Sequence, residues 1–98
     1  VSNVTNMSNM FYKAKKFNSP LNNWDVSNVR EMSQMFYEAS YDKPLNTWDV
    51  SNVIDMSDMF NTGDFSQDIS MWKINPNCNT KSMFSLVELE EKYKPKCL

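Results

Sequence analysis

The sequence predicts an α/β repeat solenoid in which each unit of 24 or 25 residues supplies one short strand and one short helix. Two observations lead to this fold class. Nearly the same stretch occurs three times, as VSNVTNMSNMF from Val1, VSNVREMSQMF from Val26 and VSNVIDMSDMF from Val50. Each unit also joins a part with helical apolar spacing to a part with strand-like apolar spacing. One unit cannot bury its apolar face, but stacked copies can.

A chain of 98 residues has the length of one domain. We expect a single solenoid domain over residues 1–98, divided into repeats 1–25, 26–49 and 50–73 and a partial repeat with a C-terminal cap over 74–98. The tail after Met83 holds the densest charge cluster and is interpreted as a helical, polar cover for the core. The N-terminal unit lacks such a cover, which predicts that further repeats or another chain cover that end.

The first part of each unit is predicted to be a helix of two to three turns. Val4, Met7, Met10 and Ala14 lie three or four residues apart, as on one helix face, and Asn28 with Glu31 resembles a capping box. We expect two ladders of equivalent residues to be largely buried, namely Met10, Met35 and Met59 with Phe11, Phe36 and Phe60. Thioethers can bind Cu(I), but helical spacing beside aromatic residues favours core packing for these methionines.

The second part of each unit, LNNWDV, LNTWDV or ISMWKI, is predicted to be a strand. Leu21, Trp24 and Val26 show the L-x-x-L-x-L spacing of a leucine-rich-repeat strand. The tryptophans could form an exposed stacking platform, but the inward leucine position favours burial, with the indole N–H hydrogen-bonded at the edge of the core.

The outward positions of that strand form the candidate partner-binding face of the expected sheet. These positions are Asn22, Asn23, Asp25, Asn46, Thr47, Asp49, Ser70 and Lys73. Repeat proteins bind partners on such faces, and a solvated surface is the alternative. The DVSN stretches offer oxygen ligands, but a calcium loop gathers several carboxylates around a glycine, so turn chemistry is favoured there.

Composition narrows the functional classes. The net charge of −2 gives no basic footprint for nucleic acid, and no apolar run approaches the ~18 residues of a membrane span. The chain has no histidine, which removes the commonest acid–base and zinc ligand. Cys78 and Cys97 could form a local disulfide or remain free thiols. We therefore expect a protein that is not an enzyme, with no catalytic residues, metal or cofactor.

The stretch FNSPLNNWDVSNVREMSQMFYEAS closely resembles the repeat of BspA-like leucine-rich-repeat surface proteins, also known as a mycoplasma-type lipoprotein repeat of unknown function. The resemblance covers residues 1 to about 84. It implies a bacterial cell-surface or lipid-anchored protein, in some cases linked to adhesion, and similar repeats occur in protists and large DNA viruses. No catalytic residue can be carried over from the family.

These observations favour a non-catalytic repeat scaffold for protein–protein or surface interaction, as part of a cell-surface or lipid-anchored adhesion-type protein. The expected location is the cell surface or the extracellular space, and the expected partner is a protein or a neighbouring subunit. The alternative is a structural component of a larger assembly, such as a large DNA virus particle, located in the virion. Neither interpretation requires nucleic acid or a membrane span in this chain.

Overall fold

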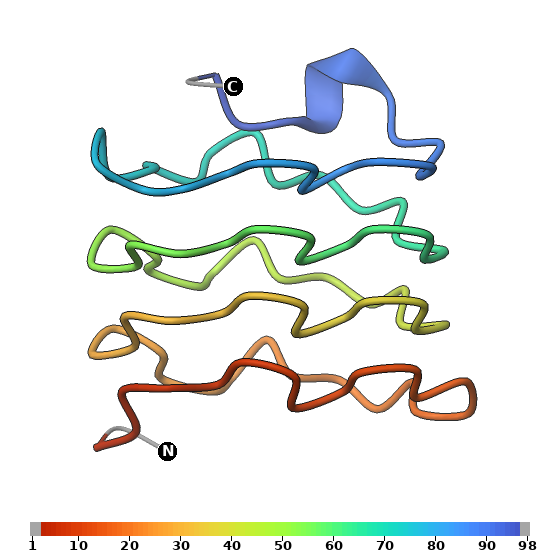
Figure 1. Cartoon of the computed structure of the whole chain (residues 1–98), viewed down its shortest axis with the longest axis horizontal. Coiled ribbons are helices and arrows are strands. Elements are labelled where there is room, and N and C mark those ends of the chain that lie inside the picture. Colours follow the sequence, from red (N-terminus) through yellow and green to blue (C-terminus); the bar gives the residue numbers. More distant parts are fainter. Residues whose placement is uncertain (1–2, 97–98) are drawn as a thin grey trace.

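Backbone hydrogen bonds between residues 23 to 26 positions apart organise the computed structural model, which describes residues 3–96. Isolated parallel bridges join Asn6 to Glu31, Glu31 to Asp55, and Asp55 to Asn79. The chain therefore runs in four stacked layers, with the N-terminal and C-terminal layers at opposite ends (Figure 1). Within the described range the only helix is η1, a 3₁₀-helix over Glu91–Tyr93.

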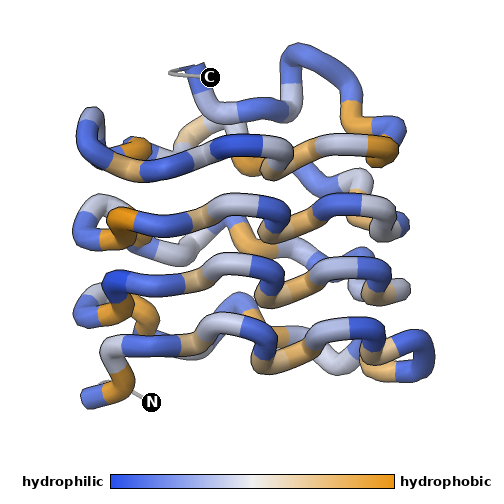
Figure 2. The backbone as a smooth tube through the Cα atoms, viewed as in Figure 1, coloured by the Kyte–Doolittle hydropathy of each residue, from blue (hydrophilic) through white to orange (hydrophobic). Residues whose placement is uncertain are grey.

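Each layer has two long sides. We call residues 6–14, 31–39, 55–63 and 79–87 the ladder segments, because backbone hydrogen bonds join each of them to the next. We call residues 18–28, 42–52, 66–76 and 89–96 the return segments, which lead the chain back across the other side (Figure 1). The Cα atoms extend over 27 × 26 × 20 Å. Apolar residues of both sides form one core cluster. Figure 2 shows that hydrophobic positions recur among hydrophilic ones at matching places in successive layers.

The ladder segments alternate two kinds of backbone hydrogen bond. The amide N–H groups of Met7, Asn9, Phe11 and Lys13 donate across to carbonyl oxygens of the second layer at 2.7–3.0 Å. Between them, the amides of Met10, Tyr12 and Ala14 donate to the carbonyl three residues earlier in the same segment. The same alternation joins the second layer to the third and the third to the fourth. Each ladder segment is therefore a run of tight turns that is also paired with its neighbour.

The prediction of an α/β repeat solenoid is wrong, because the described residues form a small globule with almost no helix or strand and no sheet. The helix expected around Met7 does not form, since its amides bond to the next layer and the backbone turns into the left-handed region at Asn9 (φ 63°) and Lys13 (φ 56°). A continuous α-helix has neither feature, because its amides donate to carbonyls four residues earlier in the same segment and its φ stays near about −63°. A turn every four residues nevertheless directs the same positions inward as a helix would.

The strands expected in the return segments are also absent. The amide of Trp24 donates to the carbonyl of Leu21, and that of Val29 to Val26, so these segments too are built from turns. The four isolated bridge positions lie instead on the ladder side. Leu21, Trp24 and Val26 still meet the core, although Trp24 is only half-buried.

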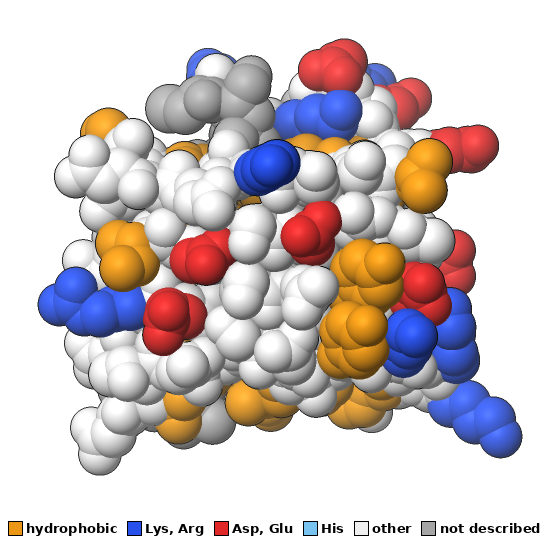
Figure 3. Space-filling model, viewed as in Figure 1, with side chains coloured by type: hydrophobic (Ala, Val, Ile, Leu, Met, Phe, Trp, Pro, Cys, Tyr) orange, Lys and Arg blue, Asp and Glu red, His pale blue; other side chains and the backbone are white. Residues whose placement is uncertain are grey.

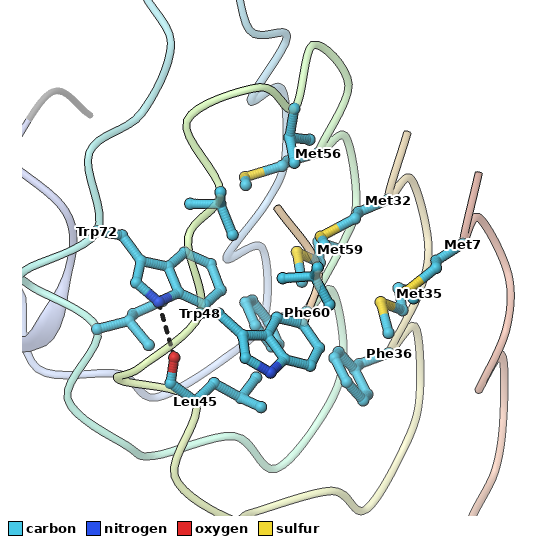
Figure 4. Close-up of a cluster of buried hydrophobic side chains, with 14 of the residues drawn as sticks. Met7, Met32, Met35, Phe36, Leu45, Trp48, Met56, Met59, Phe60 and Trp72 are labelled. Atoms are coloured by element: carbon cyan, nitrogen blue, oxygen red, sulfur yellow. Dashed lines mark hydrogen bonds between the residues drawn. The ribbon is translucent and has the colours of Figure 1, made fainter. Parts of the chain in front are cut away.

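The core consists of columns of equivalent residues, one from each layer. Met32, Met35, Met56 and Met59 are fully buried, and so are Phe36 and Phe60, whose rings stack with centroids 5.5 Å apart (Figure 4). Burial of the methionine and phenylalanine ladders is thus confirmed in the two middle layers. It is wrong for the first layer, because Met10 is 43% exposed and Phe11 half-buried. No layer covers that end within the described residues.

The C-terminal tail forms the fourth layer rather than a long helix. Met83 and Leu89 are buried, and the amide of Ile69 donates to the carbonyl of Tyr93 at 3.0 Å. The helix expected through the charged cluster reduces to η1, which has no buried residue and rises above the last layer on the return side (Figure 1). The ammonium group of Lys94 lies 5.4 Å from the ring centroid of Phe84.

Candidate functional site

The eight residues of the predicted partner-binding face all lie on the return segments. We call them the polar strip: Asn22, Asn23, Asp25, Asn46, Thr47, Asp49, Ser70 and Lys73. The strip is not a sheet face, because the return segments are built from turns. Asn22 and Ser70 are half-buried, and the other six side chains are exposed. Since equivalent positions of successive layers lie one above the other, the strip runs along the stack.

Hydrogen bonds between layers tie the first part of the strip together. The hydroxyl of Thr47 donates to Asn22, which offers its side-chain oxygen at 2.7 Å and its carbonyl oxygen at 2.5 Å. The amide of Thr47 also donates to the Asn22 side-chain oxygen at 3.2 Å, and the Asn22 side-chain amide donates to Asn46 at 3.3 Å. These contacts hold three side chains of the strip in fixed orientations.

The aspartates of the strip are fixed by the serine two residues later. Asp25 Oδ1 accepts hydrogen bonds from the hydroxyl of Ser27 at 2.6 Å and from its amide at 3.0 Å, and Asp49 does the same with Ser51. The hydrogen bond from the Ser51 side chain, then that from its amide, hold the pKa of Asp49 below its usual value. Turn chemistry therefore accounts for the DVSN motif, as the sequence predicts.

The last part of the strip borders a shallow, open hollow. Ser70 and Lys73 line it together with Met71, which is 48% exposed, and Trp72. Lys73 also lowers the pKa of Asp49, while the neighbouring Asp25 opposes this, so the three charged groups lie within electrostatic reach of one another. The strip thus combines oriented amides and hydroxyls, two carboxylates, one ammonium group and an apolar border.

A second set of polar contacts was missed by the sequence analysis. Asn18 accepts a hydrogen bond from the amide of Asp42, and the Asp42 carboxylate accepts both the amide and the hydroxyl of Ser66 at 2.9 Å. The Gln67 side chain donates to the same carboxylate at 2.9 Å. Asn18, Asp42 and Ser66 lie 24 residues apart, so the repeat spacing could have identified them.

Little in the described residues offers another chemical site. No three of their histidine, cysteine, aspartate and glutamate side chains are grouped so that they could hold a metal ion. Burial raises the pKa of the half-buried Cys78 thiol. Cys97 lies outside the described residues, so the two alternatives of a local disulfide and free thiols both stay open. None of the helical structure in residues 3–96 is long and apolar enough to cross a membrane.

The view onto the ladder segments shows a different surface from the strip. Acidic, basic and apolar side chains are scattered there among uncharged polar ones, without a continuous patch of one charge (Figure 3). Tyr12 and Tyr37 stack with centroids 5.1 Å apart, and the ammonium group of Lys13 lies over the Tyr12 ring. Polar side chains are hydrogen-bonded on this side too, because Asp55 Oδ1 accepts the amide and the hydroxyl of Ser57 at 2.9 and 2.7 Å.

Comparison with known proteins adds a family relation. A family model described as "Mycoplasma protein of unknown function, DUF285" matches residues 1–94. Searches of curated proteins and of solved structures give no match. Because the family model spans nearly the whole chain, this protein belongs to the DUF285 family, the family known for BspA-like repeats.

Proposed function

We propose that the chain is a non-catalytic scaffold that binds another protein or a cell surface through the polar strip. The observation that carries this proposal is the set of hydrogen bonds among Asn22, Asn46 and Thr47, which fixes exposed polar groups from two layers over a rigid core. A surface ordered in advance loses less conformational entropy on binding than a mobile one. The buried, stacked core beneath supplies that rigidity.

The family relation supports a location for this activity. Membership of a family known for BspA-like repeats fits a cell-surface or lipid-anchored protein of the adhesion type, acting at the cell surface or in the extracellular space. The partner would be a protein. The proposal assigns no reaction, cofactor or nucleic acid to the chain.

The test compares beads coated with the wild-type chain and with a strip variant for binding to cultured epithelial cells. The variant is Asn23→Arg/Lys73→Glu, because both side chains are exposed and neither makes a hydrogen bond in the described structure. The matched control is Asn77→Arg/Lys81→Glu, which makes the same exchanges at exposed residues outside the strip. We expect the wild type and the control to bind, and the strip variant to lose most binding. No wild-type binding, or equal loss in both variants, would overturn the proposal.

A structural component of a larger assembly, such as a large DNA virus particle in the virion, is the second candidate. It is favoured by one observation, the partly exposed apolar end of the first layer formed by Met10, Phe11, Phe17 and Trp24. A neighbouring subunit, or a further repeat of the same chain, would cover such a surface. Under this alternative, purified particles would contain the chain in fixed proportion to their major shell protein, and beads coated with the chain would not bind cells.

A further inference from the structure

Tyr12 and Tyr37 form a pair of stacked rings on the outer face of the ladder segments. Each directly follows the phenylalanine that its layer contributes to the core, and neither belongs to the core cluster itself. Tyr12 is 42% exposed and Tyr37 is half-buried. The equivalent positions of the next two layers hold Asn61 and Ser85, so the two phenols are neighbours of each other and of no further tyrosine in this column.

The backbone register between the first two layers places the two rings side by side. The amide of Phe11 donates to the carbonyl of Met35 at 2.9 Å, and the amide of Lys13 donates to that of Tyr37 at 2.7 Å. These two hydrogen bonds flank Tyr12 and hold it next to Tyr37. The rings lie 10° from parallel, with centroids 5.1 Å apart. The pairing therefore follows from the hydrogen bonds between layers rather than from a chance meeting of surface side chains.

The two phenol groups are open to oxidation. Neither the Tyr12 nor the Tyr37 hydroxyl has a hydrogen-bond partner within residues 3–96, and the ammonium group of Lys13 lies 5.4 Å from the Tyr12 ring centroid. Tyr41 differs, because it is 1% exposed and its hydroxyl oxygen accepts the amide of Leu21. Two radicals formed on neighbouring rings couple far faster than radicals that must first meet by diffusion, because the fold has already brought them together.

We propose that Tyr12 and Tyr37 are a site of oxidative modification, at which hydrogen peroxide and a haem peroxidase join the two rings into a dityrosine cross-link. Each phenol loses one electron and its hydroxyl proton, and the two radicals form a carbon–carbon bond between the ring carbons next to the hydroxyl groups. Each of these carbons then releases its hydrogen as a proton, and each phenol oxygen regains one. The rings thus lose two hydrogen atoms in all, and one peroxide molecule takes them up and becomes two molecules of water. The exposed ring of Tyr12 can tilt toward Tyr37 to form this bond, since exposed side chains change rotamer readily.

The cross-link fastens the first layer to the second by a covalent bond. It closes a loop between residues 25 positions apart, so it restricts the unfolded chain as a disulfide of the same span does. The oxidised chain should therefore unfold at a higher urea concentration than the unmodified chain. Both tyrosines lie on the ladder segments and the polar strip lies on the return segments, so the cross-link and the binding proposed for the strip are tested separately.

The test treats the 98-residue chain at low micromolar concentration with a haem peroxidase and hydrogen peroxide, followed by mass spectrometry and dityrosine fluorescence. We expect a monomer that has lost two hydrogen atoms, a change that is distinct from methionine oxidation, which adds oxygen. Fragmentation of the cross-linked peptides should place the bond between Tyr12 and Tyr37. Tyr12→Phe and Tyr37→Phe each keep the stacked ring but remove one phenol, and each should lower the fluorescence at least about tenfold. Tyr93→Phe, at a half-buried tyrosine of the fourth layer, is the matched control and should cross-link as the wild type does.

Three results would overturn the proposal. The first is a wild-type chain that gains oxygen on its methionines but never loses the two hydrogen atoms. The second is dityrosine that forms only between chains, seen as a dimer, or that forms equally in Tyr12→Phe. The third is a cross-linked chain whose urea midpoint equals that of the unmodified chain, since a bond between two layers must restrict the unfolded state. Circular dichroism of each variant before oxidation establishes that folding is intact, so that a change in yield reports on the tyrosine pair.

Discussion

The indole N–H of Trp72 donates a hydrogen bond of 2.9 Å to the carbonyl oxygen of Leu45, which belongs to the preceding layer (Figure 4). Trp48 makes the same bond to Leu21, also at 2.9 Å, and the two indoles stack 6.4 Å apart. A buried tryptophan usually needs such a partner for its N–H group. Each indole therefore fastens its own layer to the preceding one while its ring fills the core.

Replacing Trp48 with phenylalanine should destabilise the fold. Trp48→Phe removes the bond to Leu21 and part of the buried ring, which should cost about 1–3 kcal/mol of unfolding free energy, measured by urea denaturation. Trp24→Phe is the matched control, because Trp24 is half-buried and its indole N–H has no partner in the described residues. Equal costs at the two positions would contradict the fastening role.

The methionine column gives a second comparison between equivalent positions. Met35→Ala should cost about 2–5 kcal/mol, the range for a truncated core methionine, because Met35 is fully buried. Met10→Ala should cost less than about 1 kcal/mol, because Met10 is 43% exposed. Urea denaturation at low protein concentration measures both. A Met10→Ala cost as large as that of Met35→Ala would show that the first layer is covered in solution.

The apolar spacing predicted which side chains are buried, but it misassigned the backbone that carries them. Positions three or four apart, such as Met32, Met35 and Phe36, face inward from a helix and equally from a turn at every fourth residue. The pattern of side chains cannot distinguish the two, because the difference lies in where the amides donate. Burial of Met35 and Phe36 could thus be predicted, and the amide of Phe36 donating to Met59 could not.

The polar strip, too, could be predicted from the sequence only in part. Its residues could be chosen from the sequence because they flank Trp24, Trp48 and Trp72, and the serine contacts of Asp25 and Asp49 followed from known turn chemistry. The bonds from Thr47 to Asn22 depend on how two layers are aligned. That alignment is set by the hydrogen bonds between ladder segments on the other side of the molecule. A helical interpretation of those segments leaves no amides free for such bonds, because helical amides donate within their own segment.

Backbone strain at Thr62 provides a direct test of the turns in the ladder segments. Thr62 has φ of 60°, a conformation that a β-branched residue rarely adopts. Thr62→Gly should therefore be more stable than Thr62→Ala. The difference should be at most about 1 kcal/mol, because the backbone strain that alanine suffers here is partly balanced by the larger conformational entropy that glycine loses on folding. Both changes remove the same hydroxyl contact with Asn61, so the comparison isolates the backbone. If a helix formed here, alanine would be the more stable of the two.

The strip aspartates should make the fold sensitive to acid. Since hydrogen bonds from Ser51 lower the pKa of Asp49 in the folded state, its contribution to stability is present above the ordinary pKa of 3.8 and is lost as the pH falls further. Asp49→Asn should flatten the loss of stability between pH 5 and pH 2, because an asparagine can accept the same bonds, as Asn75 does from Asn77. Ser51→Ala should flatten it too. Thermal melts across this range measure the effect, and unchanged acid sensitivity in both variants would contradict it.

Tyr41 should produce the opposite dependence at alkaline pH. Its ring is buried, its hydroxyl oxygen accepts the amide N–H of Leu21 at 3.2 Å, and burial raises the pKa of the phenol above its ordinary 10.0. Its contribution is therefore fully present below pH 10.0 and is lost as the pH rises through the raised pKa, because the unfolded chain ionises first.

Tyr41→Phe should cost about 1–2 kcal/mol at pH 7, since the Leu21 amide loses its acceptor, and should lose less stability than the wild type above pH 10. Tyr12→Phe, at an exposed ring, should keep the wild-type alkaline profile. Urea denaturation at pH 7, 10 and 11 distinguishes these outcomes, and parallel alkaline losses in Tyr41→Phe and the wild type would show that the Tyr41 phenol does not control this transition.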